Sequence, residues 1–408
     1  MYKILVVDDS ALMRRIICDI INADSDFRVI DVSADGEDAY NKIKNQSFDM
    51  VVLDMILPKM SGLECLEKLV SNRVPFNVIL VSSSLKEDAD STIRAIELGA
   101  LDFVVKPIRS TQESRTEFSR DLLNAMHNAT KMRSFKTINA KSLSSSANIT
   151  GDKNLSNFER NRNPKTFIDS SKGGDKSSLF SNSRVHDKAD SKSSSISKDT
   201  KSYEYEGTII DCKPARGKKI IALACSTGGP QALHTFVPML PKNLSCPLVI
   251  VQHMPQGFTA SLASRLDQIS QIRVKEAEDG EFFKPGIVYI TPGGKHMEIC
   301  ENASRECYCH LSDDPPVNSL KPCADVMYKS LTKSSFDEIL CVVLTGMGAD
   351  GSEGIKFLKQ FKKTYVISQE ASTCVVYGMP KAVEQAGLSN EIVPLKSVAN
   401  SIVKKLGG

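Results

Sequence analysis

The chain has 408 residues, of which 41% are hydrophobic, enough for the cores of two or three domains. Its formal net charge of +3 is nearly balanced and gives no case for nucleic acid as a partner. The N-terminus enters an apolar strand without a signal region, and no apolar run reaches the roughly 20 residues that span a bilayer. We therefore expect a cytoplasmic protein without membrane insertion.

The first part of the chain alternates short apolar runs with amphipathic stretches. Strands are predicted at residues 4–7, 28–32, 50–53, 78–81 and 102–105, and helices at residues 11–22, 36–45, 62–71, 88–98 and 112–127. Five strand–helix units in this order favour a parallel sheet with helices on both of its faces. The sequence therefore predicts an α/β domain over residues 1–125.

Polar and charged side chains stand where four of these strands end. Asp8 and Asp9 follow the first strand, Asp54 the third, Ser82 the fourth and Lys106 the fifth. Each alone is typical of an ordinary loop, but the carboxyl ends of parallel strands together form the crevice in which ligands bind. Three carboxylates gathered there need a hard cation such as Mg²⁺, and an amine beside them can pair with a phosphoryl group. A serine hydroxyl could hydrogen-bond that group and draw its loop inward, so the set indicates a phosphorylation switch.

At these motifs residues 1–125 resemble a response-regulator receiver domain, which implies a flavodoxin-like (βα)5 fold. The resemblance implies that Asp54 accepts the phosphoryl group and that the strand-end serine and lysine are the switch residues. It also implies that Asp9 and Asp54 bind Mg²⁺ directly, that Asp8 acts through water, and that the Ile56 main-chain carbonyl completes the protein ligands. Receivers often have an acidic side chain at the position of Ile56. Because the ligand there is a backbone carbonyl, we expect metal binding to survive this departure.

The composition changes between about Ser134 and Tyr205, where Ser, Lys, Asn and Asp dominate and aromatic residues are few. Such a segment buries too little apolar surface to offset the entropy lost when its chain is ordered. We predict a disordered linker over residues 126–216. A phosphorylated or partner-binding tail is the alternative.

A second α/β domain is predicted over residues 217–408. Its strands are predicted at residues 219–224, 248–251, 287–290, 339–344 and 364–367. Glycine-rich turns and helical patterns separate most of these strands, which favours a doubly wound fold with a mostly parallel sheet.

Ser226 follows the first of these strands and precedes a helical stretch that begins near Gln231. A serine on such a turn lies beside helix N-terminal N–H groups that stabilise negative charge, which favours a nucleophile. The alternative is a phosphate or dinucleotide loop, but the run Ser226-Thr-Gly-Gly-Pro230 lacks both G-x-G-x-x-G and the lysine of a P-loop.

A nucleophilic serine needs a base, and the chain has six histidines. His253 follows the strand at 248–251, on the edge from which Ser226 emerges, and we favour it as the base over a satisfied structural histidine. His296 lies in a predicted loop and could contact substrate. The other histidines lie in the linker (His186), in the last helix of the first domain (His127), two turns into the helix after the serine (His234) and in a cysteine-rich strand (His310).

The third member of a triad should be an acid at another strand end. Asp350 follows the strand at 339–344, where it can orient His253 and stabilise its imidazolium. The backbone N–H of Met347, in the same glycine-flanked turn, could donate to an oxyanion. The order Ser, His, Asp differs from the Ser, Asp, His order of α/β-hydrolases, so the assignment depends on geometry.

The eleven cysteines are scattered and odd in number, and most lie in apolar runs. Buried free thiols in a reducing compartment explain this pattern better than disulfides. The tightest group is Cys300, Cys307, Cys309 and His310, whose Cys-x-Cys spacing fits one face of a strand and lacks the usual spacing of zinc ligands. We predict structural cysteines there, with zinc as the alternative.

The motifs of the second domain together resemble the catalytic domain of the chemotaxis protein-glutamate methylesterase family. The matching stretches are Ser226-Thr-Gly-Gly229, Gln252-His-Met-Pro255, Tyr289-Ile-Thr-Pro-Gly293 with His296-Met297, Pro315-Pro-Val-Asn318, Leu344-Thr-Gly-Met-Gly348 with Asp350-Gly351, and Thr373-Cys-Val-Val-Tyr-Gly-Met-Pro380. A receiver, a linker and this domain, in that order, match the whole enzyme. By this resemblance Ser226, His253 and Asp350 form the triad, and the Met347 N–H contributes to the oxyanion hole.

The resemblance implies hydrolysis of γ-glutamyl methyl esters on methyl-accepting chemoreceptors to glutamate and methanol, and deamidation of receptor glutamines by the same chemistry. The esterase step would use no cofactor, the receiver would use Mg²⁺, and the chemotaxis histidine kinase would be the phosphodonor. We predict that the unphosphorylated receiver covers the Ser226 cleft. Phosphorylation of Asp54 would then shift the population toward an open form.

The chain departs from the family pattern at a few positions. Ala224 and Cys225 stand where the family usually has glycine and alanine before the serine. Cys323 follows Pro322, where the family tends to have serine. Three alternative functions follow from the pattern: a non-catalytic receiver adaptor, a DNA-binding response regulator, and an esterase for another methylated sensory protein. The intact Ser-His-Asp set argues against the first. The balanced charge and the absence of a helix-turn-helix pattern argue against the second.

Overall fold

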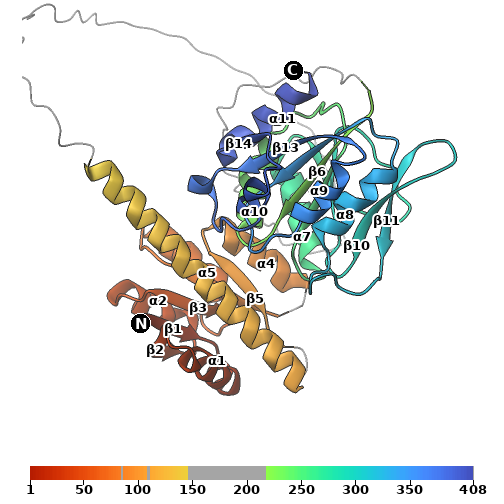
Figure 1. Cartoon of the computed structure of the whole chain (residues 1–408). Coiled ribbons are helices and arrows are strands. Elements are labelled where there is room, and N and C mark those ends of the chain that lie inside the picture. Colours follow the sequence, from red (N-terminus) through yellow and green to blue (C-terminus); the bar gives the residue numbers. More distant parts are fainter. Residues whose placement is uncertain (84–85, 108–110, 146–216, 408) are drawn as a thin grey trace, which may run out of the picture. The chain divides into compact units, whose positions relative to one another are not determined.

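The computed structural model of the chain describes residues 1–83, 86–107, 111–145 and 217–407 (Figure 1). Of these, residues 1–141 and 217–407 belong to one compact unit. Most of the predicted linker, residues 146–216, lies outside the described residues. No helix within the described ranges is long and apolar enough to cross a membrane.

The first sheet has five parallel strands in the order β2-β1-β3-β4-β5, which confirms the flavodoxin-like prediction. The strands are β1 (Tyr2–Val7), β2 (Phe27–Ser33), β3 (Met50–Asp54), β4 (Val78–Ser82) and β5 (Asp102–Val105). The helices that follow them are α1 (Ala11–Ala23), α2 (Gly36–Asn45), α3 (Gly62–Ser71), α4 (Lys86–Glu97) and α5 (Gln112–Ser145). The chain passes from β1 to β2 on one side and to β3 on the other, so the crevice between the ends of β1 and β3 is the topological switch point.

The strands of this sheet are covered on both faces. In β1, Ile4 and Val6 join one apolar cluster while Leu5 and Val7 join the cluster on the opposite face, and all four are buried. A strand that is buried on both faces needs a continuous apolar run, because successive side chains point in opposite directions. Such runs are what the sequence pattern detects.

The long helix α5 differs from its prediction. It has 34 residues and continues well past residue 127, where the apolar pattern ends. Phe118, Leu122 and Met126 recur every four positions and are buried against the first sheet. The sequence beyond them has no glycine or proline before Gly151, so no helix-breaking residue ends α5 where the apolar pattern does. The predicted boundary of the first domain therefore lies inside this helix.

The second sheet has seven strands, all parallel, in the order β14-β13-β12-β6-β7-β9-β8. They are β6 (Lys219–Cys225), β7 (Leu248–Gln252), β8 (Arg273–Glu276), β9 (Ile287–Ile290), β12 (Glu338–Val343), β13 (Lys363–Gln369) and β14 (Glu391–Val393). The five strands predicted from the sequence are all present. The edge strands β8 and β14 were not predicted, because they have only four and three residues, which is too short for an apolar run, and each includes a charged side chain.

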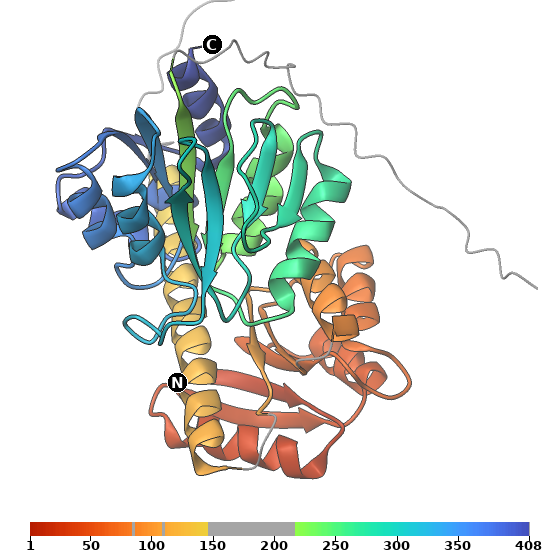
Figure 2. The same ribbon diagram turned by 90° about the vertical axis from the view of Figure 1, so that its right-hand side faces the viewer.

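Helices cover both faces of this sheet, as Figure 2 shows. One face packs against α6 (Gly229–Phe236), α7 (Phe258–Ile269) and α11 (Val398–Leu406), and the other against α8 (Ala324–Ser330), α9 (Ser352–Leu358) and α10 (Met379–Gln385). Short 3-10 turns lie at Val237–Met239, Leu331–Lys333, Ala371–Thr373 and Leu395–Ser397. The predicted doubly wound fold is therefore confirmed.

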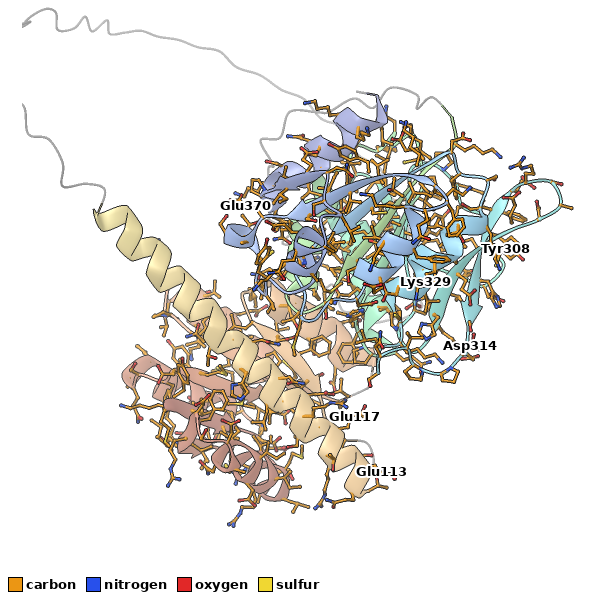
Figure 3. The ribbon with its side chains drawn as sticks, viewed as in Figure 1. Glu113, Glu117, Tyr308, Asp314, Lys329 and Glu370 are labelled. Atoms are coloured by element: carbon orange, nitrogen blue, oxygen red, sulfur yellow. The ribbon has the colours of Figure 1, made fainter. Side chains whose placement is uncertain are left out.

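A small antiparallel pair of strands, β10 (His296–Glu301) and β11 (Cys307–Ser312), stands apart from the main sheet. Figure 3 labels Tyr308 on this hairpin and Asp314 just beyond it. Cys307 and Cys309 are buried on one face of β11, as the Cys-x-Cys spacing indicates. The ten cysteines in the described part of the chain are free thiols. Three side-chain groups among the described residues have the spacing of metal ligands, and none of them includes the hairpin cysteines.

The strands β6 and β12 lie side by side at the centre of the second sheet. From β6 the chain proceeds to β7 and the edge at β8, whereas from β12 it proceeds to β13 and the opposite edge at β14. The crevice between the carboxyl ends of β6 and β12 is therefore the topological switch point of this sheet, where ligands of open α/β sheets bind.

Candidate functional site

Ser226 directly follows β6, on a tight turn at residues 226–229 that we call the nucleophile turn. Its backbone N–H donates to the Thr345 carbonyl at 3.0 Å, which ties the turn to the segment after β12. Gly228 has φ +76°, and a Cβ there would lie 2.3 Å from Val375 Cβ. The left-handed backbone and this close contact both require glycine, which explains part of the Thr-Gly-Gly run.

His253 and Asp350 form a direct pair. The His253 backbone N–H donates to the Cys225 carbonyl at 3.1 Å, which holds His253 beside the nucleophile turn. Its Nε2 lies 2.7 Å from Asp350 Oδ2. Burial by itself would raise the pKa of Asp350, but the hydrogen bond and charge of His253 and the backbone N–H groups of Ala324 and Asp325 lower this pKa to about 2. Asp350 is therefore ionised at neutral pH and can stabilise an imidazolium.

Gln252, for which no role was predicted, joins Ser226 to His253. Its Nε2 donates to the Ser226 carbonyl at 3.1 Å and to the His253 carbonyl at 3.0 Å, and its Oε1 accepts from Cys225 Sγ at 3.0 Å. A Cβ at Gly229 would lie 2.0 Å from Gln252 Oε1, so this glycine makes room for the amide. The only signal in the sequence was the position of Gln252 next to His253 at the end of β7.

Ser226 and His253 both line a cleft of about 1100 Å³. Because Asp350 engages Nε2 of His253, Nδ1 is the nitrogen available to the serine hydroxyl. In the described part of the chain no hydrogen bond joins Ser226 Oγ to His253, and the two side chains share only the cleft. Catalytic hydrogen bonds often tighten only when substrate binds, so this geometry remains compatible with a triad.

Met347 lines the same cleft. Its neighbour Gly346 packs against Ser226, since a Cβ at Gly346 would lie 2.9 Å from Ser226 Cβ. The Gly346 N–H donates to the Val376 carbonyl at 3.0 Å, and the Met379 N–H donates to the Gly346 carbonyl at 2.9 Å. These bonds fix the turn after β12 beside Ser226. The role of the Met347 N–H as an oxyanion donor stays a prediction.

The other described histidines have partners outside the triad. These contacts are His234 Nε2 to Glu97 Oε1 at 2.8 Å, His127 Nε2 to Asp24 Oδ2 at 2.9 Å, and His310 Nδ1 to Asp279 Oδ1 at 3.1 Å. His296 begins β10 instead of lying in a loop, is 1% exposed, and has its Nε2 3.2 Å from the Pro315 carbonyl. It does not line the cleft, so the geometry gives no support to a contact with substrate. His186 lies outside the described residues.

The acidic residues of the first domain gather between the ends of β1 and β3. Ligand oxygens of Asp8, Asp9 and Asp54 lie within 4.8 Å of one another. Lys106 reaches them from the end of β5, with its Nζ 2.6 Å from Asp54 Oδ2 and 2.9 Å from Asp8 Oδ2. Burial raises the pKa of Asp54 to about 6, although the ammonium of Lys106 opposes this rise. One amine therefore serves two buried carboxylates.

This donor set fits Mg²⁺. It offers carboxylate oxygens only, and the raised pKa of Asp54 shows that its negative charge is incompletely compensated. The backbone N–H of Ile56 lies 3.4 Å from Asp54 Oδ1, so the chain at Ile56 runs close to the carboxylate while its side chain is 54% exposed. Coordination through the Ile56 carbonyl stays a prediction.

Ser82 is the last residue of β4 and is fully buried. Its Oγ accepts a hydrogen bond from Thr92 Oγ1 at 2.9 Å and donates to the Ser83 carbonyl at 3.3 Å. Thr92 belongs to α4 and is also fully buried. Thr92 was not predicted as a site residue, because the apolar pattern of an amphipathic helix does not distinguish a buried threonine. The candidate switch hydroxyl is therefore held by α4.

The same helix contacts the second domain. Glu97, the last residue of α4, accepts two hydrogen bonds from Arg265 of α7, at 2.6 Å from Nε and 2.9 Å from Nη2. Burial would raise the pKa of Glu97, but His234 and Arg265 lower it to about 2. Ala89 and Ile93 of α4 belong to the apolar cluster that α6 and α7 form. Both charge and apolar burial thus join α4 to the second domain.

Residues of the first domain also border the cleft at Ser226. The Asn128 side chain in α5 donates to Met347 Sδ at 3.3 Å. Asp102 of β5 and Thr227, the residue after the candidate nucleophile, both line this cleft. Residues of β5 and α5 are thus neighbours of the cleft that Ser226 lines.

A Ser-His-Asp set at the switch point of a doubly wound sheet, in a chain that also has a receiver-type acidic crevice, defines a response-regulator hydrolase. The family described as CheB methylesterase matches residues 221–402, and the response regulator receiver domain family matches residues 4–114.

Two relatives that match nearly the whole chain have the same enzyme description. The chain is 34% identical over 407 residues to protein-glutamate methylesterase/protein-glutamine glutaminase 1 of Syntrophomonas wolfei, with 99% of each chain covered. It is 35% identical over 403 residues to the protein-glutamate methylesterase/protein-glutamine glutaminase of Bacillus subtilis, with 98% of each chain covered. The chain belongs to this family.

Two solved structures from Thermotoga maritima match parts of the chain. The CheB methylesterase catalytic domain is 39% identical, covers 47% of this chain and 100% of its own, and has a TM-score of 0.45. The response regulator domain of CheB is 36% identical, covers 32% of this chain and 97% of its own, and has a TM-score of 0.30.

Proposed function

We propose that this chain is a chemotaxis adaptation enzyme, which hydrolyses γ-glutamyl methyl esters on methyl-accepting chemoreceptors and deamidates receptor glutamines. The observation that carries the proposal is the buried His253–Asp350 pair at the cleft that Ser226 also lines. The names of two relatives that match nearly the whole chain include both activities, protein-glutamate methylesterase and protein-glutamine glutaminase. One nucleophile can serve both, because a methyl ester and a primary amide differ only in the leaving group.

In the acylation step, Ser226 Oγ attacks the γ-carbonyl carbon of the substrate. His253 Nδ1 accepts the hydroxyl proton, and Asp350, hydrogen-bonded at Nε2, stabilises the imidazolium. The Met347 backbone N–H donates to the carbonyl oxygen as it becomes negative. The tetrahedral intermediate then breaks its bond to the methoxy group, which leaves as methanol with the proton returned by His253.

In the deacylation step, water attacks the acyl ester on Ser226 and gives a proton to His253. The second tetrahedral intermediate releases the glutamate side chain, and the proton returns to Ser226 Oγ. With a glutamine substrate the first leaving group is ammonia instead of methanol. Apart from the substrate and this water, these steps use only side chains and backbone groups of the chain.

We propose further that a histidine kinase phosphorylates Asp54. Asp9 and Asp54, with Asp8 through water, would hold Mg²⁺, which supplies positive charge against the phosphoryl oxygens. The Lys106 amine would pair with one of those oxygens. Ser82 would give up the Ser83 carbonyl to donate to another. The movement of its Oγ toward the phosphoryl group would break the hydrogen bond from Thr92, and this exchange would release the hold of β4 on α4.

We propose that the receiver inhibits the catalytic domain until this exchange occurs. Support comes from the contacts of α4 with Arg265 and from the position of Asp102 and Asn128 at the cleft. Loss of these contacts would shift the population toward a form in which Ser226 is accessible to a receptor helix. The catalytic domain that we propose spans residues 217–408.

The test is methanol release from methylated receptor membranes by the purified full chain with Mg²⁺, with or without a small-molecule phosphodonor. Ser226→Ala should abolish release, and Asp54→Asn should abolish only the stimulation by phosphodonor. Release that ignores the phosphodonor would retain the esterase and refute the gating. No release from any receptor tested would favour a non-catalytic adaptor or an esterase for another methylated sensory protein. We propose a cytoplasmic location, where the methylated segment of the receptors lies.

A further inference from the structure

The carboxylate of Asp350 is surrounded by donors. Oδ2 accepts from His253 Nε2 at 2.7 Å and from the Ala324 backbone N–H at 2.6 Å. Oδ1 accepts from the Asp325 backbone N–H at 2.9 Å and from Cys323 Sγ at 3.1 Å. Cys323 is therefore the one side chain besides His253 that donates to Asp350 in the described part of the chain.

The direction of the Cys323 hydrogen bond is fixed by chemistry. Asp350 is ionised above its pKa of about 2 and then has only acceptor lone pairs. Burial, with the nearby charge of Asp350, raises the pKa of Cys323 to about 12, so the thiol keeps its proton and is the donor. Cys323 is fully buried and does not line the cleft, so it can reach the reaction only through Asp350.

The backbone around Asp350 is held independently of the thiol. Asp325 Oδ1 accepts from the Gly351 N–H at 3.0 Å and from the Gly354 N–H at 2.6 Å, which fixes the segment that follows Asp350. The thiol instead acts on the carboxylate itself. It restrains Oδ1, so that Oδ2 stays directed at His253, and it withdraws negative charge from the group that stabilises the imidazolium.

We propose that Cys323 is a positioning residue, whose S–H bond to Asp350 Oδ1 orients the triad acid and moderates its charge. The proposal rests on the proposed esterase function, since it assigns a role within that triad. A serine hydroxyl can donate in the same way, whereas alanine cannot. Cys323→Ser and Cys323→Ala therefore separate the hydrogen bond from the mere presence of a side chain.

The experiment measures kcat and KM for methanol release against pH, with the phosphodonor-activated full chain and methylated receptor membranes. We expect Cys323→Ala to lower kcat about tenfold, in the range of one hydrogen bond to a charged group, with KM unchanged. Without the thiol Asp350 retains more of its negative charge and stabilises the imidazolium more strongly, so the acid limb of the kcat/KM profile should move to higher pH. For Cys323→Ser, the acid limb of the kcat/KM profile should lie at the same pH as in the protein without substitutions.

Cys341→Ala is the matched control, because it removes a fully buried thiol from β12, whose side chain belongs to the core. It should leave the pH profile unchanged. The proposal is overturned if Cys323→Ala keeps the original profile, or if Cys323→Ser and Cys323→Ala lose kcat equally without moving the limb.

A second readout does not depend on substrate. In protein with ¹⁵N-labelled histidine, the downfield proton signal of the His253–Asp350 hydrogen bond should persist in Cys323→Ser and shift or broaden in Cys323→Ala. An unchanged signal in Cys323→Ala overturns the proposal even if the alanine protein is too unstable for kinetics. Failure of the proposed function would give a different result. The protein without substitutions would release no methanol, although the proton signal of its His253–Asp350 hydrogen bond is present.

Discussion

Replacing Glu97 by glutamine tests the proposal that the receiver inhibits the catalytic domain. The Glu97 side chain is 19% exposed and accepts hydrogen bonds of 2.6 and 2.9 Å from Arg265. Hydrogen bonds to charged groups contribute roughly 1.5–3 kcal/mol. Because the Arg265 side chain is 36% exposed, solvent screening reduces the contribution of this pair to about 1–1.5 kcal/mol. That is roughly a five- to tenfold change in the ratio of closed to open protein.

The assay is methanol release by the full chain without phosphodonor. Glu97→Gln should raise this basal rate about five- to tenfold, the factor expected from loss of the Glu97–Arg265 ion pair. The phosphodonor-stimulated rate should stay unchanged. Glu67→Gln is the matched control, since it breaks an exposed pair with Arg94 at 3.0 Å inside the receiver. A basal rate of Glu97→Gln equal to that of the original protein would refute the claim that the α4–α7 contact holds the closed form.

The pH dependence of this contact has a defined sign. The pKa of Glu97 is about 2 in the closed form and 4.5 ordinarily. Its carboxylate therefore stabilises the closed form fully above the ordinary pKa, and this stabilisation is lost as the pH falls from 4.5 toward 2. The contact should be intact at neutral pH. Protection of α7 amides from hydrogen exchange, corrected for the intrinsic effect of pH, should decline only on the acidic side of this range.

Three further changes test other contacts. Thr92→Val removes a hydrogen bond to Ser82 worth roughly 0.5–1.5 kcal/mol and should lower the phosphodonor concentration for half-activation about threefold; an unchanged activation curve would contradict a holding role for Thr92. Burial raises the pKa of Asp54 to about 6, so the charged carboxylate destabilises the folded protein. Asp54→Asn removes this charge, and calorimetry should show the full increase in Tm above pH 6 and no increase below pH 3.8. Gly346→Ala would place a Cβ 2.3 Å from Met379 Sδ and 2.9 Å from Ser226 Cβ, so methanol release should fall severely. A normal kcat would show that the turn can move to accommodate the methyl group without displacing Ser226.

Residues at strand ends could be predicted from the sequence for a physical reason. A parallel strand covered on both faces reads as an unbroken apolar run, and the polar residue that ends the run lies at the carboxyl edge of the sheet. Asp54 and Ser82 are the last residues of β3 and β4, and His253 directly follows β7. The same reasoning placed Ser226 after β6. It brought these residues to the correct edges without any knowledge of distances.

The residues that orient the site could not be found in this way. Gln252, Cys323 and Thr92 each stand next to an apolar residue in the sequence, and nothing in the local pattern marks a buried polar side chain there. Their hydrogen-bond partners lie elsewhere in the sequence; Cys323 and Asp350, for example, are 27 positions apart. The length of α5 also escaped prediction, because its last turns have neither an apolar stripe nor a helix-breaking residue. Sequence patterns register burial and periodicity, whereas these features depend on tertiary contacts.

The two switch points each hold a buried aspartate, and the pKa values of these two aspartates are shifted in opposite directions because their numbers of hydrogen-bond donors differ. Asp54 shares the single amine of Lys106 with Asp8, so burial dominates and raises its pKa to about 6. Asp350 has four donors to itself, and its pKa falls to about 2 despite burial. A carboxylate with a raised pKa, such as Asp54, is stabilised when a cation or a covalent bond neutralises its charge, which suits a phosphoacceptor. A carboxylate with a lowered pKa, such as Asp350, stays an anion throughout a reaction, which suits the partner of an imidazolium.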